Sequence, residues 1–386
     1  MLPLYLLAIT SLLVGSAAFY MAMIEAFPVQ WLYYRARFGK PVVWGILLGS
    51  IAWALWTTEQ TGAFPAFATV PLLLMGLGVV LSYRATQEHI FQAVDFPALA
   101  EDPLALPLTD DMQVAIVEHD GVTKAYPLDY VVHHHIINDR FGDRIVALTY
   151  CAMCRSVIPF DVTDIGPLYV ASFKNANMVV ADRKTNTFFQ QASFDSIIGK
   201  LHPHTLTMLP FQILSWGDVK KLNPVPQVVH VTEKDLRQFE LPIPGVWDKI
   251  MASEATPGLS ARNRDKTFPA RTRVVGVTDP RHPTEVVYLK DELMNRRLVH
   301  NPARNLYLVA VNNTVNAFTD HLAGTTLDLT LHSNNTLSDA STGTRWDLRG
   351  KRIDGKLESD LDPIPVSDEY WFSWQRFHSP TELIRV

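Results

Sequence analysis

The chain of 386 residues is 48% hydrophobic and carries 34 basic against 39 acidic side chains, which gives a formal net charge of −5. This length favours two or three folding units, and an acidic balance without a Lys/Arg run gives no electrostatic basis for binding nucleic acid. Two cysteines are too few for a framework of several disulfides.

Three apolar stretches at the N-terminal end predict membrane spans. They run from about Leu4 to Phe27, from about Val42 to Trp56 and from about Phe64 to Tyr83. A helix needs about 20 apolar residues to cross a hydrocarbon core about 30 Å thick, which the first and third stretches supply and the second approaches. We therefore expect an all-α, three-helix anchor over residues 1–84, in a multi-pass protein of the cell (inner) membrane. A cleaved signal peptide is the alternative for the first stretch, although no Lys or Arg precedes it.

Basic residues around these stretches bear on the orientation in the membrane. Arg35, Arg37 and Lys40 lie between the first two predicted spans, and Arg84 follows the third. The segment between the second and third spans has no basic residue. The bias of Lys and Arg towards cytoplasmic segments therefore favours a cytoplasmic location for the rest of the chain.

Beyond the anchor, the sequence predicts a mainly β structure with minor α-helix. A Pro-rich, aperiodic segment favours an extended connector over residues 85–111. Short apolar or alternating runs bounded by Gly, Asp and Asn then predict strands. These runs are Val114–Val117, Ile145–Tyr150, Leu168–Phe173 and Met178–Ala181, and a short helix is expected near Val131–Ile137.

Several segments of the soluble part recur at a nearly constant separation. Asp182–Phe189 parallels Asp339–Trp346, Ile198–Leu201 parallels Asp354–Leu357, and Leu214–Trp216 parallels Phe372–Trp374. Such recurrence is typical of repeated structural units. We predict two tandem related β-rich units, a first one over residues 112–240 and a second, degenerate one over residues 270–386, joined by a linker over residues 241–269.

The first unit alone contains a Cys-x-x-Cys motif, Cys151 to Cys154. The matching stretch of the second unit, near residues 309–314, has no cysteine. Features present in both units are expected to serve packing and turn geometry, so a feature of one unit is a better candidate for chemistry. Two thiols at this spacing can close a redox-active disulfide or bind a soft metal ion as thiolates. Structural or inert cysteines are the alternative.

Histidines could complete a metal site with these thiols, for copper or zinc. The candidates are His133, His134 and His135, followed by His202 and His204. Three consecutive side chains cannot all face one way, so at least one of the first group has another role. A plain loop role is the alternative for His202 and His204. Covalent haem is not expected, because Arg155 occupies the position where the attachment motif requires histidine.

Several short segments of the soluble part together form a recognisable set. They are Ala125–Pro127, His134 with Ile136–Asp139, Thr149–Cys154, Phe160–Asp161, Asn177–Val179, Asp182–Thr185 and Ser215–Trp216. This set resembles family 3179 of the domains of unknown function. The resemblance covers roughly Met112 to the C-terminus, including the degenerate second unit.

The resemblance implies a preference among the candidate ligands. It makes His134 the favoured histidine, and it keeps both Cys151 and Cys154. His135 replaces an acidic residue of the family pattern, and Arg155 replaces a glycine. The predicted metal site is therefore Cys151, Cys154 and His134, with His135, His202 and His204 as weaker candidates. Many family members resemble exported proteins, which implies a periplasmic or extracytoplasmic soluble part, against the count of basic residues.

These observations predict a membrane-anchored accessory protein with a possible metal-binding or thiol-redox site. The alternative is a structural or scaffolding subunit of a larger membrane protein complex, without a catalytic role. The expected partners are the membrane and other membrane protein subunits. No Gly-x-Ser-x-Gly, phosphate-binding Gly loop or His-Glu-x-x-His motif occurs. The sequence therefore assigns no enzymatic reaction and favours a non-enzymatic role.

Overall fold

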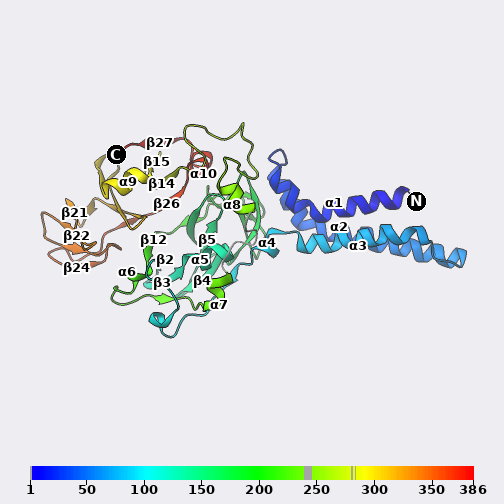
Figure 1. The fold of residues 1–386 in the computed structure, drawn as a ribbon, viewed down its shortest axis with the longest axis horizontal. Coiled ribbons are helices and arrows are strands. Elements are labelled where there is room, and N and C mark those ends of the chain that lie inside the picture. Colours follow the sequence, from blue (N-terminus) through cyan, green and yellow to red (C-terminus); the bar gives the residue numbers. More distant parts are fainter. Residues whose placement is uncertain (1, 239–245, 280, 283) are drawn as a thin grey trace.

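A computed structural model describes residues 2–238, 246–279, 281–282 and 284–386 of the chain. Three long helices at the N-terminal end form a rod that projects from a β-rich body (Figure 1). This arrangement confirms the predicted fold class, three apolar helices followed by a mainly β part with minor α-helix. The first residues of the predicted linker, 241–245, lie outside the described residues.

The rod contains the three predicted membrane spans. It consists of α1 (Leu2–Met23), α2 (Val29–Thr61) and α3 (Thr69–Arg84), and a short 3₁₀ turn at Ala66–Ala68 precedes α3. α1, α2 and the continuous segment Ala66–Arg84, which joins the 3₁₀ turn to α3, are each long and apolar enough to cross a membrane. Their outer faces expose many large apolar side chains, which fits a lipid-facing surface.

α2 begins well before the second apolar stretch of the sequence. Its 33 residues span about 50 Å at 1.5 Å per residue, against a hydrocarbon core of about 30 Å. Roughly 13 residues at its N-terminal end therefore extend beyond the core, on the side of the body (Figure 1). Arg35, Arg37 and Lys40 lie in this helical extension and not in the inter-span loop expected from the sequence.

Small residues allow α1 and α3 to pack closely. A Cβ atom added at Gly15 would lie 2.2 Å from the Gly78 carbonyl oxygen, and one at Gly78 would lie 2.3 Å from Ser11 Oγ. Ser11 and Gly15, like Gly78 and Ser82, are four positions apart, which is the small-residue spacing of close helix pairs in membranes. Arg35 joins the same contact, because its Nη2 donates to the carbonyls of Gly15 at 2.8 Å and Ser82 at 3.2 Å.

The turn between α1 and α2 attaches the rod to the body. Lys174 Nζ donates to the carbonyl oxygens of Met21 at 3.0 Å and Ile24 at 2.6 Å. The rings of Tyr33 and Phe188 pack edge to face with centroids 5.3 Å apart. Polar and apolar contacts together therefore hold the helical rod against the body.

The first β-rich unit contains three sheets. Strands that follow one another along the chain pair antiparallel, and strands from more distant segments join the edges of the first two sheets. The first has the order β12 (Phe211–Ser215), β2 (Gln113–His119), β3 (Val122–Pro127), β13 (Gln227–Val228). The second has the order β1 (Val94–Asp95), β4 (Ile136–Phe141), β5 (Arg144–Cys151), β6 (Ser156–Asp161), β11 (Thr207–Met208). The third has the order β10 (Ser196–Ile198), β9 (Phe188–Gln190), β8 (Asn177–Asp182), β7 (Leu168–Lys174).

The second unit repeats this plan. Its first sheet has the order β26 (Val366–Tyr370), β14 (Arg273–Val277), β15 (Glu285–Leu289), β27 (Thr381–Ile384). Its second has the order β16 (Leu298–Asn301), β17 (Leu306–Val311), β18 (Thr314–Thr319), β25 (Pro363–Ile364). Its third has the order β21 (Leu329–Leu331), β22 (Leu337–Asp339), β23 (Arg345–Trp346), β24 (Arg352–Asp354), beside a small hairpin of β19 (His321–Leu322) and β20 (Thr325–Thr326).

Short helices connect or cover these sheets. They are α4 (Gln87–Ile90), α5 (Leu128–His134), α6 (Trp216–Val219), α7 (Glu233–Gln238), α8 (Val246–Met251), α9 (Lys290–Arg296) and α10 (Trp371–Phe377). α5 and α9 occupy matching places, since each follows the second strand of its unit's first sheet.

The sheet register corrects one detail of the predicted repeat. Ser215 pairs with Gln113 and is followed by Trp216 at the start of α6, whereas Tyr370 pairs with Arg273 and is followed by Trp371 at the start of α10. Trp216 therefore corresponds to Trp371, and the sequence match with Trp374 was shifted by one helical turn. A short aromatic motif cannot fix register, because neighbouring tryptophans offer alternative matches.

Part of the predicted connector belongs to the folded body. β1 pairs in parallel with β4, so that Val94 lies opposite Ile137 and Asp95 opposite Asn138. Leu106 and Leu108 are buried in the core of the first unit. The connector that the Pro-rich composition predicted over residues 85–111 therefore contributes an edge strand and core side chains.

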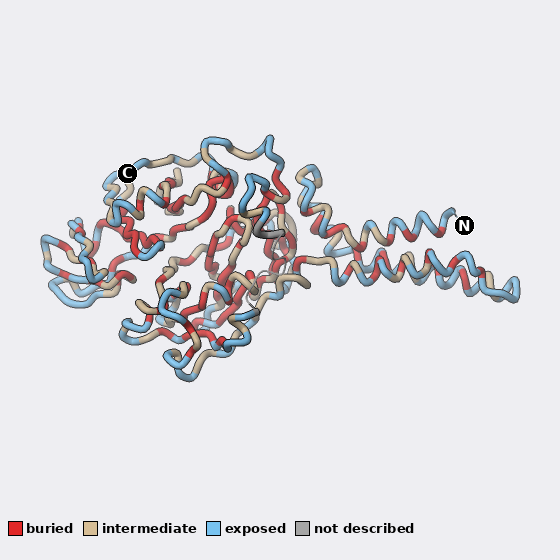
Figure 2. Tube along the Cα trace, in the orientation of Figure 1, coloured by how far each residue is buried: buried red, intermediate tan, exposed pale blue. Residues whose placement is uncertain are grey.

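The two units pack against each other in a reciprocal way. β12 of the first unit contacts β18 of the second, and β26 of the second contacts β6 of the first. These strands hold matching positions in their units, so the contact resembles a two-fold interface within one chain. Buried residues from both units merge into common cores, and Figure 2 shows the buried segments concentrated where the strands meet.

Candidate functional site

The two cysteines lie at the turn between β5 and β6. Cys151 ends β5 and Cys154 lies within the turn. Their exposed fractions are 2% and 0%, and both are free thiols. Their Sγ atoms are 3.3 Å apart. A disulfide bond is about 2.05 Å long, so a small shift of the turn would bring the sulfurs to bonding distance.

This turn is longer in the first unit than in the second. Cys151 pairs with Ser156 across it, and the equivalent pair of the second unit is Val311 with Thr314. Residues 152–155 of the first unit therefore correspond to Asn312 and Asn313 alone. The alignment of the motif with residues 309–314 is confirmed, and the cysteine-bearing turn is an addition specific to the first unit.

Amide side chains surround Cys154 and hold it in place. Asn177 Nδ2 donates to Cys154 Sγ at 3.1 Å, and that sulfur also contacts the Ala176 carbonyl oxygen at 3.1 Å. Gln191 Oε1 accepts from Asn177 Nδ2 at 3.0 Å, and Gln190 Nε2 donates to Asn177 Oδ1 at 2.6 Å. All three amide side chains are buried. A buried, connected network of this kind fixes the geometry of the thiol that it touches.

The two thiols differ in acidity. Burial raises the pKa of Cys154 well above its usual value, and the adjacent Cys151 sulfur raises it further. Burial acts the same way on Cys151, but hydrogen bonds from the Cys154 thiol and from nearby backbone amides lower the pKa of Cys151 below its ordinary value. Cys151 is therefore the sulfur that more readily becomes a thiolate, and Cys154 is the one that stays protonated.

The second unit closes this site from the other side. The Tyr370 backbone amide donates to the Cys154 carbonyl oxygen at 3.0 Å. The neighbouring Glu369 is fully buried, and burial raises the pKa of its carboxyl group. Its charge also acts to raise the pKa of Cys154. The dithiol therefore lies at the junction of the two units, and residues of both units form its surroundings.

A cavity of about 210 Å³ lies next to the cysteine-bearing turn, between the two units. Tyr150 and Arg155, which flank the motif, line it from the first unit, and Arg273 and Asp368 line it from the second. Asp368 also accepts from the buried Lys290 Nζ at 2.5 Å. Burial lowers the pKa of Lys290 to about 8, against the opposing effect of Asp368. Charged side chains therefore surround the motif, and a cavity lies beside it.

The predicted histidines lie in separate places. His134 ends α5 and its Nδ1 lies 3.1 Å from the Gln92 carbonyl oxygen, and burial lowers its pKa. His135 is buried and stacks on the Phe91 ring, with centroids 4.0 Å apart. His202 Nδ1 contacts the Ser196 carbonyl oxygen at 2.9 Å.

His133 and His204 make ring contacts instead. The His133 ring packs edge to face on His134, with centroids 4.8 Å apart, and the His204 ring packs on Phe189 at 6.0 Å. Among the residues that the structure describes, no three or more His, Cys, Asp or Glu side chains form a group that could hold a metal ion. The structure thus brings Cys151 and Cys154 together and does not add His134, His135, His202 or His204 to them as a ligand set.

Sequence reasoning did not identify the amides of the site. Asn177, Gln190 and Gln191 lie on or just after β8 and β9, and only the folded sheet brings them to Cys154. Single amides on a strand give no pattern of their own. The one available signal was the Asn177–Val179 segment, which belongs to the family resemblance.

Comparison with known proteins identifies a family without a known activity. The model of the family described as "Protein of unknown function (DUF3179)" matches residues 90–381. No curated protein and no solved structure matches the chain. The matched region begins just before β1 and ends at the start of β27 (Thr381–Ile384), so it covers both β-rich units except this last strand, with the cysteine motif inside it.

Proposed function

Since the chain belongs to the DUF3179 family, whose function is unknown, we propose that it is a membrane-anchored accessory protein in which Cys151 and Cys154 form a thiol-redox site. The observation that supports this most directly is the 3.3 Å separation of two buried Sγ atoms in a turn that only one unit has. The helical rod would keep this site close to the membrane.

The proposed chemistry is thiol–disulfide exchange with a disulfide-bearing oxidant, either a small molecule or a protein. The Cys151 thiolate attacks the oxidant, forming a mixed disulfide and releasing one thiol. Cys154 then loses its proton and attacks Cys151 Sγ, which releases the second thiol and leaves a Cys151–Cys154 disulfide. Two electrons and two protons pass from the pair to the oxidant. Because both sulfurs are buried, the turn at residues 152–155 has to move aside for the first attack.

The unequal surroundings of the two sulfurs support these roles. Asn177 and the Ala176 carbonyl hold Cys154, while hydrogen bonds that favour the thiolate lower the pKa of Cys151. A dithiol in which one sulfur is activated and the other is held protonated suits an attacking and a resolving role.

Redox trapping of the full chain tests this proposal. The protein is extracted from membranes, and its free thiols are blocked at low pH. The mass of the Cys151–Cys154 peptide is then measured by mass spectrometry, with and without prior reduction. We expect a reducible disulfide in part of the material. Cys151→Ser and Cys154→Ser should each abolish it, while Ser156→Ala, which leaves both thiols, should keep it. Two permanently free thiols under every oxidant would contradict the proposal.

The metal-binding alternative rests on the same two thiolates, which suit a soft ion such as copper or zinc. Metal content per chain, measured on the same preparations, separates it from the redox site. Stoichiometric metal that is lost in Cys151→Ser would favour the metal, and His134→Ala then asks whether the imidazole takes part. If neither metal nor disulfide is found, the scaffold alternative takes precedence, and a particle much larger than the single chain after gentle extraction would support it.

We propose that the body faces the periplasmic or extracytoplasmic side, as the exported character of the resembling family implies. The structure puts Arg35, Arg37, Lys40 and Arg84 on the same side as the body, so the count of basic residues still favours the cytoplasm.

Labelling of intact cells with a membrane-impermeant thiol reagent tests on which side of the membrane the body lies. In a background without Cys151 and Cys154, Ser333→Cys on the exposed body surface should be labelled, and Ala63→Cys beyond the opposite end of α2 should not; the reverse pattern would overturn the orientation.

A further inference from the structure

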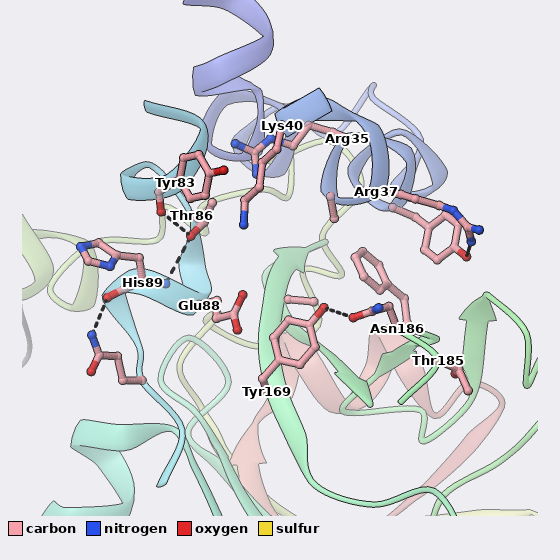
Figure 3. Close-up of a pocket in the computed structure, with 15 residues that line it drawn as sticks. Arg35, Arg37, Lys40, Tyr83, Thr86, Glu88, His89, Tyr169, Thr185 and Asn186 are labelled. Carbon is pink, nitrogen blue, oxygen red and sulfur yellow. Dashed lines mark hydrogen bonds between the residues drawn. The ribbon is translucent and has the colours of Figure 1, made fainter. Parts of the chain in front are cut away.

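A cavity of about 600 Å³ lies where the helical rod meets the body. The first turns of α2 form one wall, the segment from the end of α3 into α4 forms another, and the sheet of β7, β8 and β9 forms the third (Figure 3). Lys40 reaches from α2 into this space, above Glu88 and Tyr169 (Figure 3). The cavity is separate from the cysteine site, since none of its lining residues belongs to the β5–β6 turn.

The position of the cavity in the membrane follows from the length of α2. If the 21 residues from Pro41 to Thr61 cross the core, which takes about 30 Å at 1.5 Å per residue, then Lys40 lies at the boundary and Arg37 lies one turn outside it. Tyr83 and Trp44 lie at the same level, with Trp44 Nε1 3.3 Å from Tyr83 Oη. Tyrosine and tryptophan are typical of the headgroup layer. The cavity therefore opens at the depth of lipid headgroups.

The cavity carries an excess of positive charge. Arg35, Arg37 and Lys40 line it together with one carboxylate, Glu88. Glu88 is already paired with Arg183, at 3.7 Å. Within the described part of the chain, none of the three cavity cations has a carboxylate within ion-pairing distance, and their neighbours are carbonyls or aromatic rings. Unneutralised cations beside a membrane surface attract anions.

A neutral amide in the wall suits an oxyanion. Tyr169 Oη donates to Asn186 Oδ1 at 3.0 Å, which leaves the Asn186 amide nitrogen available to an acceptor. The hydroxyl groups of Thr86 and Thr185 donate to the Tyr83 carbonyl oxygen and to Asp182 Oδ2, so they are not donors to a ligand. Lys40 Nζ lies 4.5 Å from the centre of the Tyr83 ring and keeps its three hydrogens for other partners. A phosphate group has the charge and the acceptor oxygens that such a set recognises.

We propose that this cavity binds a phosphate group, supplied by the headgroup of an anionic phospholipid. The lipid tails would lie along the exposed apolar faces of α2 and α3, and the phosphate would sit below Lys40, with Arg37 as a second cation at the rim of the cavity (Figure 3). Arg35 has a different task, because its guanidinium is bound to the carbonyls of Gly15 and Ser82 and holds the helices together. The site would link the body of the protein to the composition of the membrane.

Native mass spectrometry of the full chain tests the proposal. The detergent-solubilised protein is mixed with phosphatidylglycerol or phosphatidylcholine, and bound lipid is counted per chain. We expect about one retained phosphatidylglycerol with an affinity at least ten-fold above that for phosphatidylcholine, and a loss of this preference at high salt. Arg37→Gln with Lys40→Gln should weaken phosphatidylglycerol binding at least ten-fold. Arg296→Gln with Lys356→Gln removes the same charge from exposed sites on the body and should change nothing.

Inorganic phosphate distinguishes the two possible sources of the group. If millimolar inorganic phosphate displaces the lipid, the cavity recognises phosphate as such and a soluble phosphate compound is its ligand. If only phospholipid binds, the headgroup is confirmed. Equal retention of both lipids by the parent protein, or equal loss in the two double variants, would overturn the proposal. Since lipid preference and its salt dependence are measured on the parent protein, a failure of the Arg37/Lys40 variant to fold does not prevent the test.

Discussion

Arg155 adopts a left-handed backbone conformation, with φ at 60°, directly after Cys154. The resembling family commonly has glycine at this position, and the structure explains why, since a side chain there costs about 1 kcal/mol or more. The same turn carries Ala152 and Met153 between the thiols. The strain therefore lies in the segment that would have to move aside in the proposed thiol–disulfide exchange.

We predict that Arg155→Gly stabilises the protein. Relief of the left-handed strain exceeds the entropy that glycine adds to the unfolded chain, so the free energy of unfolding should rise by up to about 1 kcal/mol. Arg155→Ala is the matched control, because it removes the guanidinium and keeps the strain. Denaturant unfolding checks both variants, and an equal effect of Gly and Ala would show that the guanidinium, not the backbone, determines the result.

His135 gives a prediction about pH. Burial lowers its pKa from 6.5 to about 4, so the unfolded chain binds a proton between pH 6.5 and pH 4 that the folded protein does not. The free energy of unfolding therefore falls as the pH falls through this window, by about 3 kcal/mol in all. His135→Asn, which tolerates the positive φ of 63° at this position, should flatten the dependence. An unchanged pH profile of unfolding would refute the assignment.

The sequence predicted part of the site at this scale. The spacing of Cys151 and Cys154 in a turn was enough to pair the thiols, because residues three apart in a turn are necessarily close. The histidines were not equally predictable. His134 and His135 follow each other on the chain, yet the helix end at His135 turns one towards Gln92 and the other onto Phe91. Side-chain direction at a helix end depends on backbone conformation that residue type alone does not specify.

At the scale of elements, the helical rod shows what hydropathy can predict. Hydropathy located all three apolar helices, but it missed the first turns of α2, because the charged residues there lower the local hydropathy to a value typical of a loop. Those turns are helical because Tyr33 packs on Phe188 of the body and Arg35 bonds to the two neighbouring helices. The contacts that extend the helix come from distant parts of the chain.

The α1–α3 contact gives a prediction about helix packing. Gly78→Val places a Cβ 2.3 Å from Ser11 Oγ, so the helices have to separate, and overpacking of this kind costs about 1–3 kcal/mol. Gly76→Ala on the same helix meets nothing within 4 Å and should be neutral or slightly stabilising. Thermal unfolding of the detergent-solubilised chain compares the two. Equal midpoints would mean that this close approach of α1 and α3 does not stabilise the anchor.

At the scale of the whole molecule, two units of one plan enclose a site that only one of them carries. Short matching segments in the sequence were sufficient to predict the repeat, since Asp182 and Asp339 each accept a hydrogen bond from the backbone amide three residues later, of Thr185 and Thr342. The reciprocal packing of β12 on β18 and β26 on β6 was not predictable, because the sequence of a strand does not specify which strand of another sheet it will contact.

The boundaries of the body give a further prediction. A fragment of residues 90–386 keeps β1 and the buried Leu106 and Leu108, and should fold with a β-dominated circular dichroism spectrum. A fragment of residues 110–386 lacks these groups and should be less stable by several kcal/mol, at about 1.5–3 kcal/mol for each large buried side chain. Chemical unfolding of both fragments measures the difference. Equal stability would show that the segment before residue 110 is only a connector.

The central claim is that the chain presents a reversible dithiol beside a membrane, and an equilibrium redox titration of the full chain tests it most directly. The purified protein is equilibrated in glutathione buffers of graded potential, its thiols are trapped, and the fraction of Cys151–Cys154 disulfide is read by mass. The account predicts one reversible two-electron transition, absent in Cys151→Ser and in Cys154→Ser. Two thiols that stay reduced, or a disulfide that never reopens, across the whole range of potentials would contradict it.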